Sequence, residues 1–267
     1  MRSLLLILML FFSLFSDATE LRVMSSEKMP YNFTENQQFV GLTVDVIKDL
    51  LAPLSPKIEV MPWPRAFEIA KNTPNVLLFT MGKTKQRLAQ GFMYIGPVST
   101  RQLAFYTLKD ELTGLASLDE IRQKKLVIVG LRGGWSSAQL KQQGIEILEV
   151  GDYHQGILML LRNRAQLWVS TDLEAGMHLK QTGEMAELKI ALPIQCAENY
   201  LTLSPGSDPA LYQQLQKQYV AWATSKKPAA IAKKWQAYLG LPLRFAKKRG
   251  FSNSQLVHAE CPLQPEA

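Results

Sequence analysis

The sequence predicts an α/β protein of two lobes joined by two strands, and three observations support this. Strand-like and helix-like runs alternate over residues 20–79 and again over residues 117–191. Two extended segments, near 100–108 and 195–203, flank the second series. Two further helix-like stretches follow and can return to the first series. We therefore expect a discontinuous first lobe, an inserted second lobe and a hinge of two strands.

The N-terminus has the pattern of a secretory signal peptide. A basic start precedes an apolar core of about 12 residues and then small residues two apart. An uncleaved anchor is the alternative, although this run is shorter than the ~20 apolar residues of a membrane helix. The predicted divisions are a signal peptide at 1–18, a first lobe at 19–101 and 200–245, a second lobe at 102–199 and a C-terminal tail at 246–267.

Apolar patterning predicts the elements of the first series. The predicted strands lie at 20–24, 57–61 and 75–79. The predicted helices lie at 43–51 and 66–71. A polar stretch at 25–38 predicts a loop. Trp63 stands between two prolines, which predicts a rigid loop before the second helix.

The second series repeats this alternation and leads to two closing helices. Its predicted strands lie at 125–130, 145–150, 166–170 and 188–191. Its predicted helices lie at 117–122, 136–141, 155–162 and 173–181. The closing helices are expected at 209–224 and 228–239. The basic tail from Arg244 is expected to be weakly ordered unless Cys261 ties it down.

Charge and composition exclude several classes of partner. The chain has 267 residues and a net charge of +7, which stays +7 when Arg2 and Asp17 leave with the signal peptide. The basic residues are mostly scattered, and an exported protein meets little nucleic acid, so we expect no nucleic-acid partner. Three histidines stand without ligand spacing, so neither a metal site nor a cofactor is expected.

The chain contains two cysteines, Cys196 and Cys261. In an oxidising compartment such a pair can form a disulfide. The bridge would close a loop of about 65 residues and stabilise the fold by ~4 kcal/mol in the chain-entropy description. The alternative is one buried thiol and one thiol in a loose tail.

The segment 80–87 reads Thr-Met-Gly-Lys-Thr-Lys-Gln-Arg and follows a buried strand. The Thr80 hydroxyl and nearby backbone N–H groups face whatever lies at the strand end. Arg87 supplies a planar guanidinium that can hold a carboxylate with two hydrogen bonds. The segment therefore predicts an anion site, and the alternative is a surface turn with a solvated basic cluster.

Three motifs resemble type II periplasmic solute-binding proteins of the polar amino-acid class (family 3), which serve ABC transporters. They are Gly-Leu-Thr-Val-Asp-Val at 41–46, Thr-Lys-Gln-Arg at 84–87 and Val-Gly-Leu-Arg-Gly at 129–133. The resemblance implies the two-lobed type II periplasmic binding fold and a location in the periplasm. It further implies a monomer that closes over a small-molecule carboxylate and works with a membrane transporter.

The resemblance also implies ligand contacts from both lobes. Those of the first lobe are Glu27, Tyr31, Trp63, Thr80, Met81, Gly82 and Arg87. Those of the second lobe are Trp135, Ser136, Ser137, Ser170 and Asp172. Arg87 would bind the carboxylate, and the turn and helix start at 133–137, with Ser136 and Ser137, would offer it a helix N-terminus. Gly82 replaces a residue that is often Ser or Thr in the family.

A further departure stands at Ser170, where amino-acid binders often have an aspartate that pairs with the ligand's α-amino group. Asp172 can reach inward in its place, or it can cap the next helix. Amino-acid specificity is therefore less firmly implied than the fold.

Three functional hypotheses follow. The first is a non-enzymatic binding protein for an amino acid or a related compound, because no catalytic arrangement can be read from the sequence. The second is an enzyme on the same scaffold, a dehydratase of the cyclohexadienyl type with Glu27 or Asp172 as its acid. The third is a sensor module that signals through a membrane partner.

Overall fold

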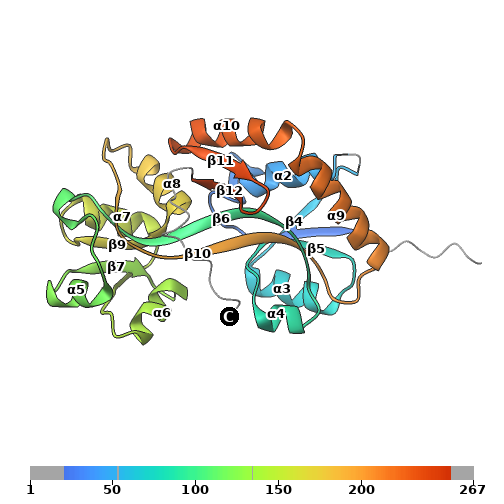
Figure 1. Cartoon of the computed structure of the whole chain (residues 1–267). Coiled ribbons are helices and arrows are strands. Elements are labelled where there is room, and N and C mark those ends of the chain that lie inside the picture. The colour runs from blue at the N-terminus through green and yellow to red at the C-terminus, as the bar shows by residue number, and fades with distance from the viewer. Residues whose placement is uncertain (1–20, 53, 134, 254–267) are drawn as a thin grey trace, which may run out of the picture.

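The structure, a computed structural model, describes residues 21–52, 54–133 and 135–253 (Figure 1). Two groups of elements lie at opposite ends of the molecule, and two long strands run between them. All the strands except one small hairpin belong to a single mixed sheet of ten strands. The predicted α/β fold of two lobes is confirmed. The predicted signal peptide lies outside the described residues.

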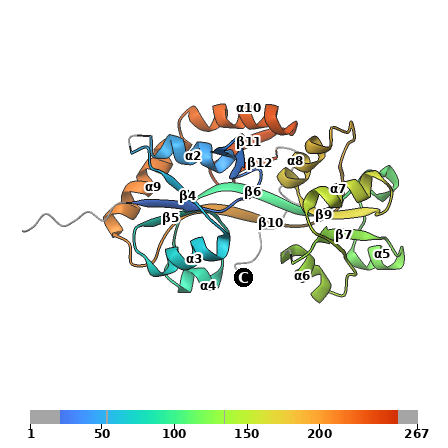
Figure 2. The ribbon, with the colours of Figure 1, turned by 180° about the vertical axis from the view of Figure 1, so that it is seen from behind.

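The first lobe is built on three parallel strands. They are β1 (Arg22–Ser25), β4 (Ile58–Val60) and β5 (Val76–Met81). The helices around them are α2 (Leu42–Leu50), α3 (Trp63–Asn72), α4 (Lys85–Ala89), α9 (Pro209–Ala223) and α10 (Lys227–Leu239). Figure 2 shows α2 and α10 over one face of the strands, and α3 and α4 over the other. All of β5 is therefore buried.

The apolar run of β5 divides between two cores because successive side chains point to opposite faces. Leu77 and Phe79 pack with α2, α9 and α10. Leu78 packs with Met24 and Ala66 on the side of α3. Two-sided burial explains why this strand reads as a continuous apolar run rather than an alternating one.

The second lobe repeats the design. Its parallel strands are β7 (Ile128–Leu131), β8 (Leu148–Val150) and β9 (Leu167–Thr171). Its helices are the 3-10 turn η2 (Asp110–Leu112), α5 (Leu118–Gln123), α6 (Trp135–Gln142), α7 (Tyr153–Leu161) and α8 (Asp172–Thr182). Side chains on both faces of its strands are buried, in two separate apolar clusters.

The hinge consists of β6 (Met93–Thr107) and β10 (Lys189–Leu203), which pair antiparallel along their length. The strand order is β4-β1-β5-β10-β6-β9-β7-β8, so these two strands occupy the centre. Both are longer than the predicted segments, and the strand expected at 188–191 is one end of β10. The divisions proposed at 101/102 and 199/200 fall within these strands, and they remain a proposal.

The predicted loop at 25–38 was wrong in its last part. It contains β2 (Phe33–Glu35), which pairs with β3 (Gln38–Val40) in a small hairpin. The buried Phe33 anchors this hairpin against Trp235 of α10. A contact so distant in sequence is not visible in local polarity.

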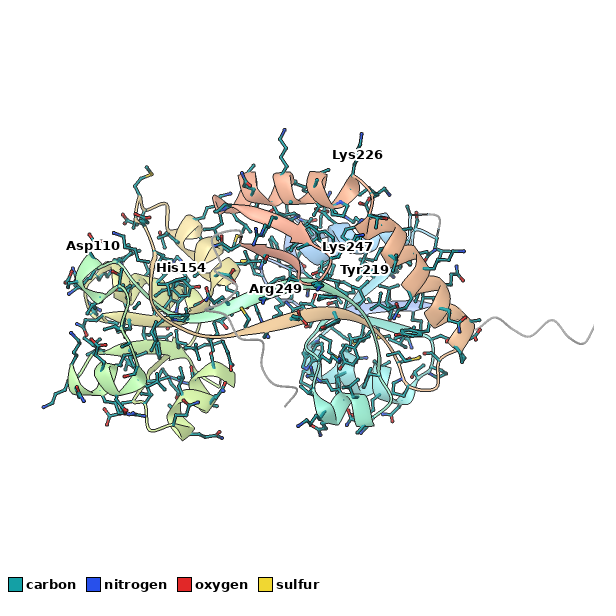
Figure 3. All side chains as sticks on the ribbon, in the orientation of Figure 1. Asp110, His154, Tyr219, Lys226, Lys247 and Arg249 are labelled. Carbon is teal, nitrogen blue, oxygen red and sulfur yellow. The ribbon has the colours of Figure 1, made fainter. Side chains whose placement is uncertain are left out.

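The tail from Arg244 was expected to be weakly ordered unless Cys261 ties it down, and over residues 244–253 it forms regular structure. Strands β11 (Leu243–Ala246) and β12 (Gly250–Asn253) form a hairpin beside β6. Phe251 is fully buried against Trp222 and Phe245. Thr100 of β6 donates a hydrogen bond to the Arg249 carbonyl at 2.6 Å, and Figure 3 shows Arg249 near the middle of the molecule.

Trp63 was predicted in a loop, but it is the first residue of α3. Pro64 occupies the second helical position, where the missing N–H has no intrahelical partner to lose. No helix in the described part of the chain is long and apolar enough to cross a membrane.

Candidate functional site

A cleft of about 690 Å³ lies where the carboxyl ends of β1 and β5 meet the hinge strands. Open parallel sheets bind ligands at this edge. Predicted site residues that line the cleft are Glu27, Trp63, Thr80, Gly82 and Arg87. The other lining residues are Ser26, Lys28, Lys83, Thr84, Arg101, Cys196, Ala197, Glu198 and Tyr200.

Arg87 is held in place by its own segment. Thr84 caps α4 by accepting a hydrogen bond from the Arg87 backbone N–H at 3.2 Å. The guanidinium Nη1 donates to the Gly82 carbonyl at 2.7 Å. The guanidinium carbon lies 5.4 Å from the ring centres of both Trp63 and Phe67. This stacking fixes the plane of the group.

Arg87 forms no ion pair with any acid among the described residues, so its charge is open to a ligand. Burial lowers its pKa, and Arg101 lowers the pKa further. A guanidinium still keeps its proton at neutral pH, because its ordinary pKa is so high.

Thr80 is the last residue but one of β5 and has a φ of 63°, which is uncommon for a β-branched residue. Its hydroxyl donates to Asn32 Oδ1 at 2.5 Å, and Asn32 Nδ2 donates to Ser25 Oγ at 3.1 Å. These buried bonds tie the loop after β1 to the end of β5. Strained backbone held this way is characteristic of ligand sites.

Lys28 comes from the loop after β1 and is half-buried. Its ammonium nitrogen lies 5.6 Å from the centre of the Tyr31 ring. The pKa of Lys28 is lowered to about 7, chiefly by burial and then by the nearby charge of Arg101, whereas Glu174 opposes the shift. At neutral pH Lys28 is therefore close to its titration midpoint.

The remaining predicted site residues do not line this cleft. They are Tyr31, Met81, Trp135, Ser136, Ser137, Ser170 and Asp172. All except Trp135, whose side chain is outside the description, are buried. The Tyr31 hydroxyl has no hydrogen-bond partner among the described residues. The roles assigned to these residues remain predictions.

Asp172 begins α8 and connects the second lobe to the hinge. Its Oδ1 accepts the backbone N–H of Gln102 in β6 at 3.0 Å. Burial raises the pKa of Asp172 to about 7, although its hydrogen bonds to backbone N–H groups oppose the rise. One carboxylate oxygen thus supports the hinge strand.

Seven charged or polar lining residues are absent from the predicted ligand contacts: Ser26, Lys28, Lys83, Thr84, Arg101, Glu198 and Tyr200. Three of them belong to the hinge strands, whose register decides which side chains reach the cleft. Cys196, also a lining residue, is disulfide-bonded. Its pairing with Cys261 stays a prediction, because Cys261 lies outside the described residues. Among the described residues, no cluster of His, Cys, Asp and Glu is suited to a metal ion.

The profile of the bacterial extracellular solute-binding proteins, family 3, matches residues 21–238. A search of curated proteins finds no match.

Several solved structures share this fold. The GluR0 ligand-binding core from Nostoc punctiforme, in complex with L-glutamate, is 16% identical, with 81% of this chain and 99% of that chain covered and a TM-score of 0.61. A histidine kinase sensor domain is 15% identical, with 82% and 97% covered and a TM-score of 0.64.

An ancestral amino-acid-binding protein, a precursor of cyclohexadienyl dehydratase, is 18% identical. The alignment covers 80% of this chain and 94% of that chain, with a TM-score of 0.61. At these identities the similarity establishes the fold and leaves the ligand open.

Proposed function

Because this chain belongs to the family 3 bacterial extracellular solute-binding proteins, we propose that it is an exported protein that captures a small carboxylated ligand without chemical change. The ligand is an amino acid or a related compound. Closure of the two lobes over it shifts an open–closed equilibrium, and a membrane transporter receives the closed form. The observation that carries this proposal is Arg87, a fixed guanidinium with no acidic partner among the described residues.

The geometry of Arg87 supports carboxylate capture. One guanidinium nitrogen is committed to the Gly82 carbonyl, and one face of the group is covered by aromatic rings. The remaining N–H donors have no hydrogen-bond partner in the described part of the chain. They can meet both oxygens of a carboxylate at once. Because the group is held before binding, little side-chain entropy is lost on association.

Thermal shift against amino acids and organic acids tests this proposal. A ligand that binds only the folded state raises the Tm. The Arg87→Met variant should bind the same ligand about tenfold or more weakly, since a charge-assisted contact is lost. Arg65→Met is the matched control, because Arg65 is exposed on α3. If the folded protein binds no carboxylate more tightly than millimolar, the proposal fails.

An enzyme is a second candidate, because Glu27 places a carboxyl group on the cleft. Both of its oxygens accept hydrogen bonds from Thr34, at 2.9 Å from the backbone N–H and 2.6 Å from the hydroxyl. Incubation with prephenate and arogenate distinguishes the two functions. Formation of an aromatic product, lost in Glu27→Gln, would replace the binding proposal.

Transport and sensing use the same capture step and differ in the membrane partner. We propose transport, and the genes beside this one separate the two. A neighbouring ABC-transporter permease supports transport, whereas a neighbouring sensor kinase without one would favour sensing.

A further inference from the structure

The charges around the cleft are unequal. Its basic lining residues are Lys28, Lys83, Arg87 and Arg101, and its acidic ones are Glu27 and Glu198. A cleft with a positive excess draws in anions and repels groups of its own sign. The positive excess would repel the ammonium group of a zwitterionic ligand and so weaken its binding.

Neither acidic lining residue is a dedicated partner for an ammonium. Both oxygens of Glu27 accept hydrogen bonds from Thr34. The Glu198 carboxylate accepts the Tyr200 hydroxyl from within the same strand. An ammonium would share acceptors that already bind groups of the protein.

The residues predicted to pair with an α-amino group do not supply such a partner either. Ser170 has no carboxylate, and both Ser170 and Asp172 are buried away from the lining of the cleft. Asp172 Oδ1 is committed to the Gln102 backbone. Among the described residues, the carboxylates that line the cleft are therefore those of Glu27 and Glu198, and both already accept hydrogen bonds from the protein.

Two of the cations that line the cleft come from different elements. Arg87 stands on α4, and Lys28 stands on the loop after β1. Arg101 and Arg87 both lower the pKa of Lys28, after the larger effect of burial, so positive groups are close enough to repel one another. Glu174 opposes this, but no ion pair joins it to Lys28 in the described residues. A bound anion would relieve the repulsion.

We propose that the cleft selects a small dicarboxylate that carries no ammonium group, with one carboxylate on Arg87 and the other at Lys28. This inference rests on the proposed binding function and narrows its ligand class. The rings of Trp63 and Tyr200 also line the cleft and would contact the carbon chain of such a ligand.

Isothermal titration calorimetry with matched pairs of ligands tests whether the cleft prefers a ligand that has no ammonium group. Glutarate is compared with L-glutamate, and succinate with L-aspartate, because each pair differs only in the amino group. The dicarboxylate should bind at least about tenfold more tightly than its amino acid, since an unpaired buried charge is costly. If the amino acid binds more tightly, this inference is overturned while the proposed function stands.

A substitution of Lys28 tests whether this residue binds the second carboxylate of the ligand. Lys28→Met should weaken glutarate about tenfold or more and weaken butyrate less than about threefold. Lys233→Met is the matched control, since Lys233 is exposed on α10. Equal losses for glutarate and butyrate would overturn the assignment. Inorganic phosphate and sulfate are titrated as well, and tighter binding of either than of glutarate would also overturn it.

These experiments distinguish failure of the proposed ligand class from failure of the proposed binding function. If any carboxylate binds through Arg87 but the matched pairs come out reversed, only the ligand class is wrong. If no carboxylate binds to the folded protein, the proposed function itself fails and this inference fails with it.

Discussion

The side chain of Arg87, the proposed carboxylate-binding group, is held in place by the protein itself. Thr84 accepts a hydrogen bond from the Arg87 backbone N–H, and the Gly82 carbonyl accepts one from a guanidinium nitrogen. The ring of Trp63 covers one face of the guanidinium group. Preorganisation of this kind lowers the entropic cost of binding. An added Cβ at Gly82 would meet no atom closer than 3.8 Å, so the missing hydroxyl of the family pattern can be restored there.

The pKa of Lys28 makes anion binding depend on pH. A bound anion raises this pKa above its value of about 7 in the empty cleft, so binding near neutral pH takes up a proton. The affinity for glutarate should therefore fall as pH rises above 7, by at most about tenfold per pH unit. Calorimetry between pH 6 and 9 measures this fall. Lys28→Met should flatten the profile, and an unchanged profile in that variant would contradict the assignment.

Gly41 is a position where only glycine fits. Its φ is 144°, and an added Cβ would lie 2.2 Å from the Tyr31 carbonyl oxygen. Gly41→Ala should therefore lower the free energy of unfolding by about 3 kcal/mol, measured by urea denaturation. Gly82→Ala is the control, since it is unstrained and should change stability by less than about 1 kcal/mol. Equal stabilities of the two variants would show that the loop at Tyr31 adapts.

At the scale of elements, β6 and β10 serve as both hinge and site. Each is 15 residues long and belongs to both lobes. The same strands carry Arg101 and Glu198 to the cleft. A rotation of the lobes would therefore move side chains that line the cleft.

The hairpin of β11 and β12 is expected to support this hinge. Phe251→Ala should lower the free energy of unfolding by about 3 to 5 kcal/mol, because a fully buried ring leaves a cavity. The measurement is chemical denaturation. Val220→Ala, at a side chain that is 57% exposed, should stay within about 0.5 kcal/mol. A loss below about 1 kcal/mol in Phe251→Ala would mean that the hairpin is dispensable.

At the scale of the molecule, the two lobes are not separate bodies. Leu173 and Met177 of α8, in the second lobe, pack into the main core of the first lobe. Lys180 of the same helix donates a hydrogen bond to the Tyr238 carbonyl at the end of α10. Closure is therefore expected to pivot about the α8 side of the molecule.

A disulfide between Cys196 and Cys261 would join the hinge to the end of the chain. Reduction should then lower stability by about 4 kcal/mol in the chain-entropy description. Thermal unfolding with and without dithiothreitol measures this loss, and titration of free thiols in the unreduced protein checks the pairing. Cys261→Ser should reproduce the effect of reduction. Free thiols in the untreated protein would contradict the bridge.

The sequence by itself determined the fold class, because buried parallel strands and amphipathic helices leave periodic apolar patterns. The sequence also predicted an anion site at the end of one buried strand, since Thr80 and Arg87 lie within one short segment. Only the tertiary structure decided which hinge residues reach the cleft, because strand register selects the face of Arg101 and Glu198. It likewise decided that Ser170 and Asp172 are buried and are not among the residues that line the cleft, and that residues 244–253 contain the hairpin of β11 and β12. Those outcomes depend on packing between segments far apart in the chain, which no local pattern records.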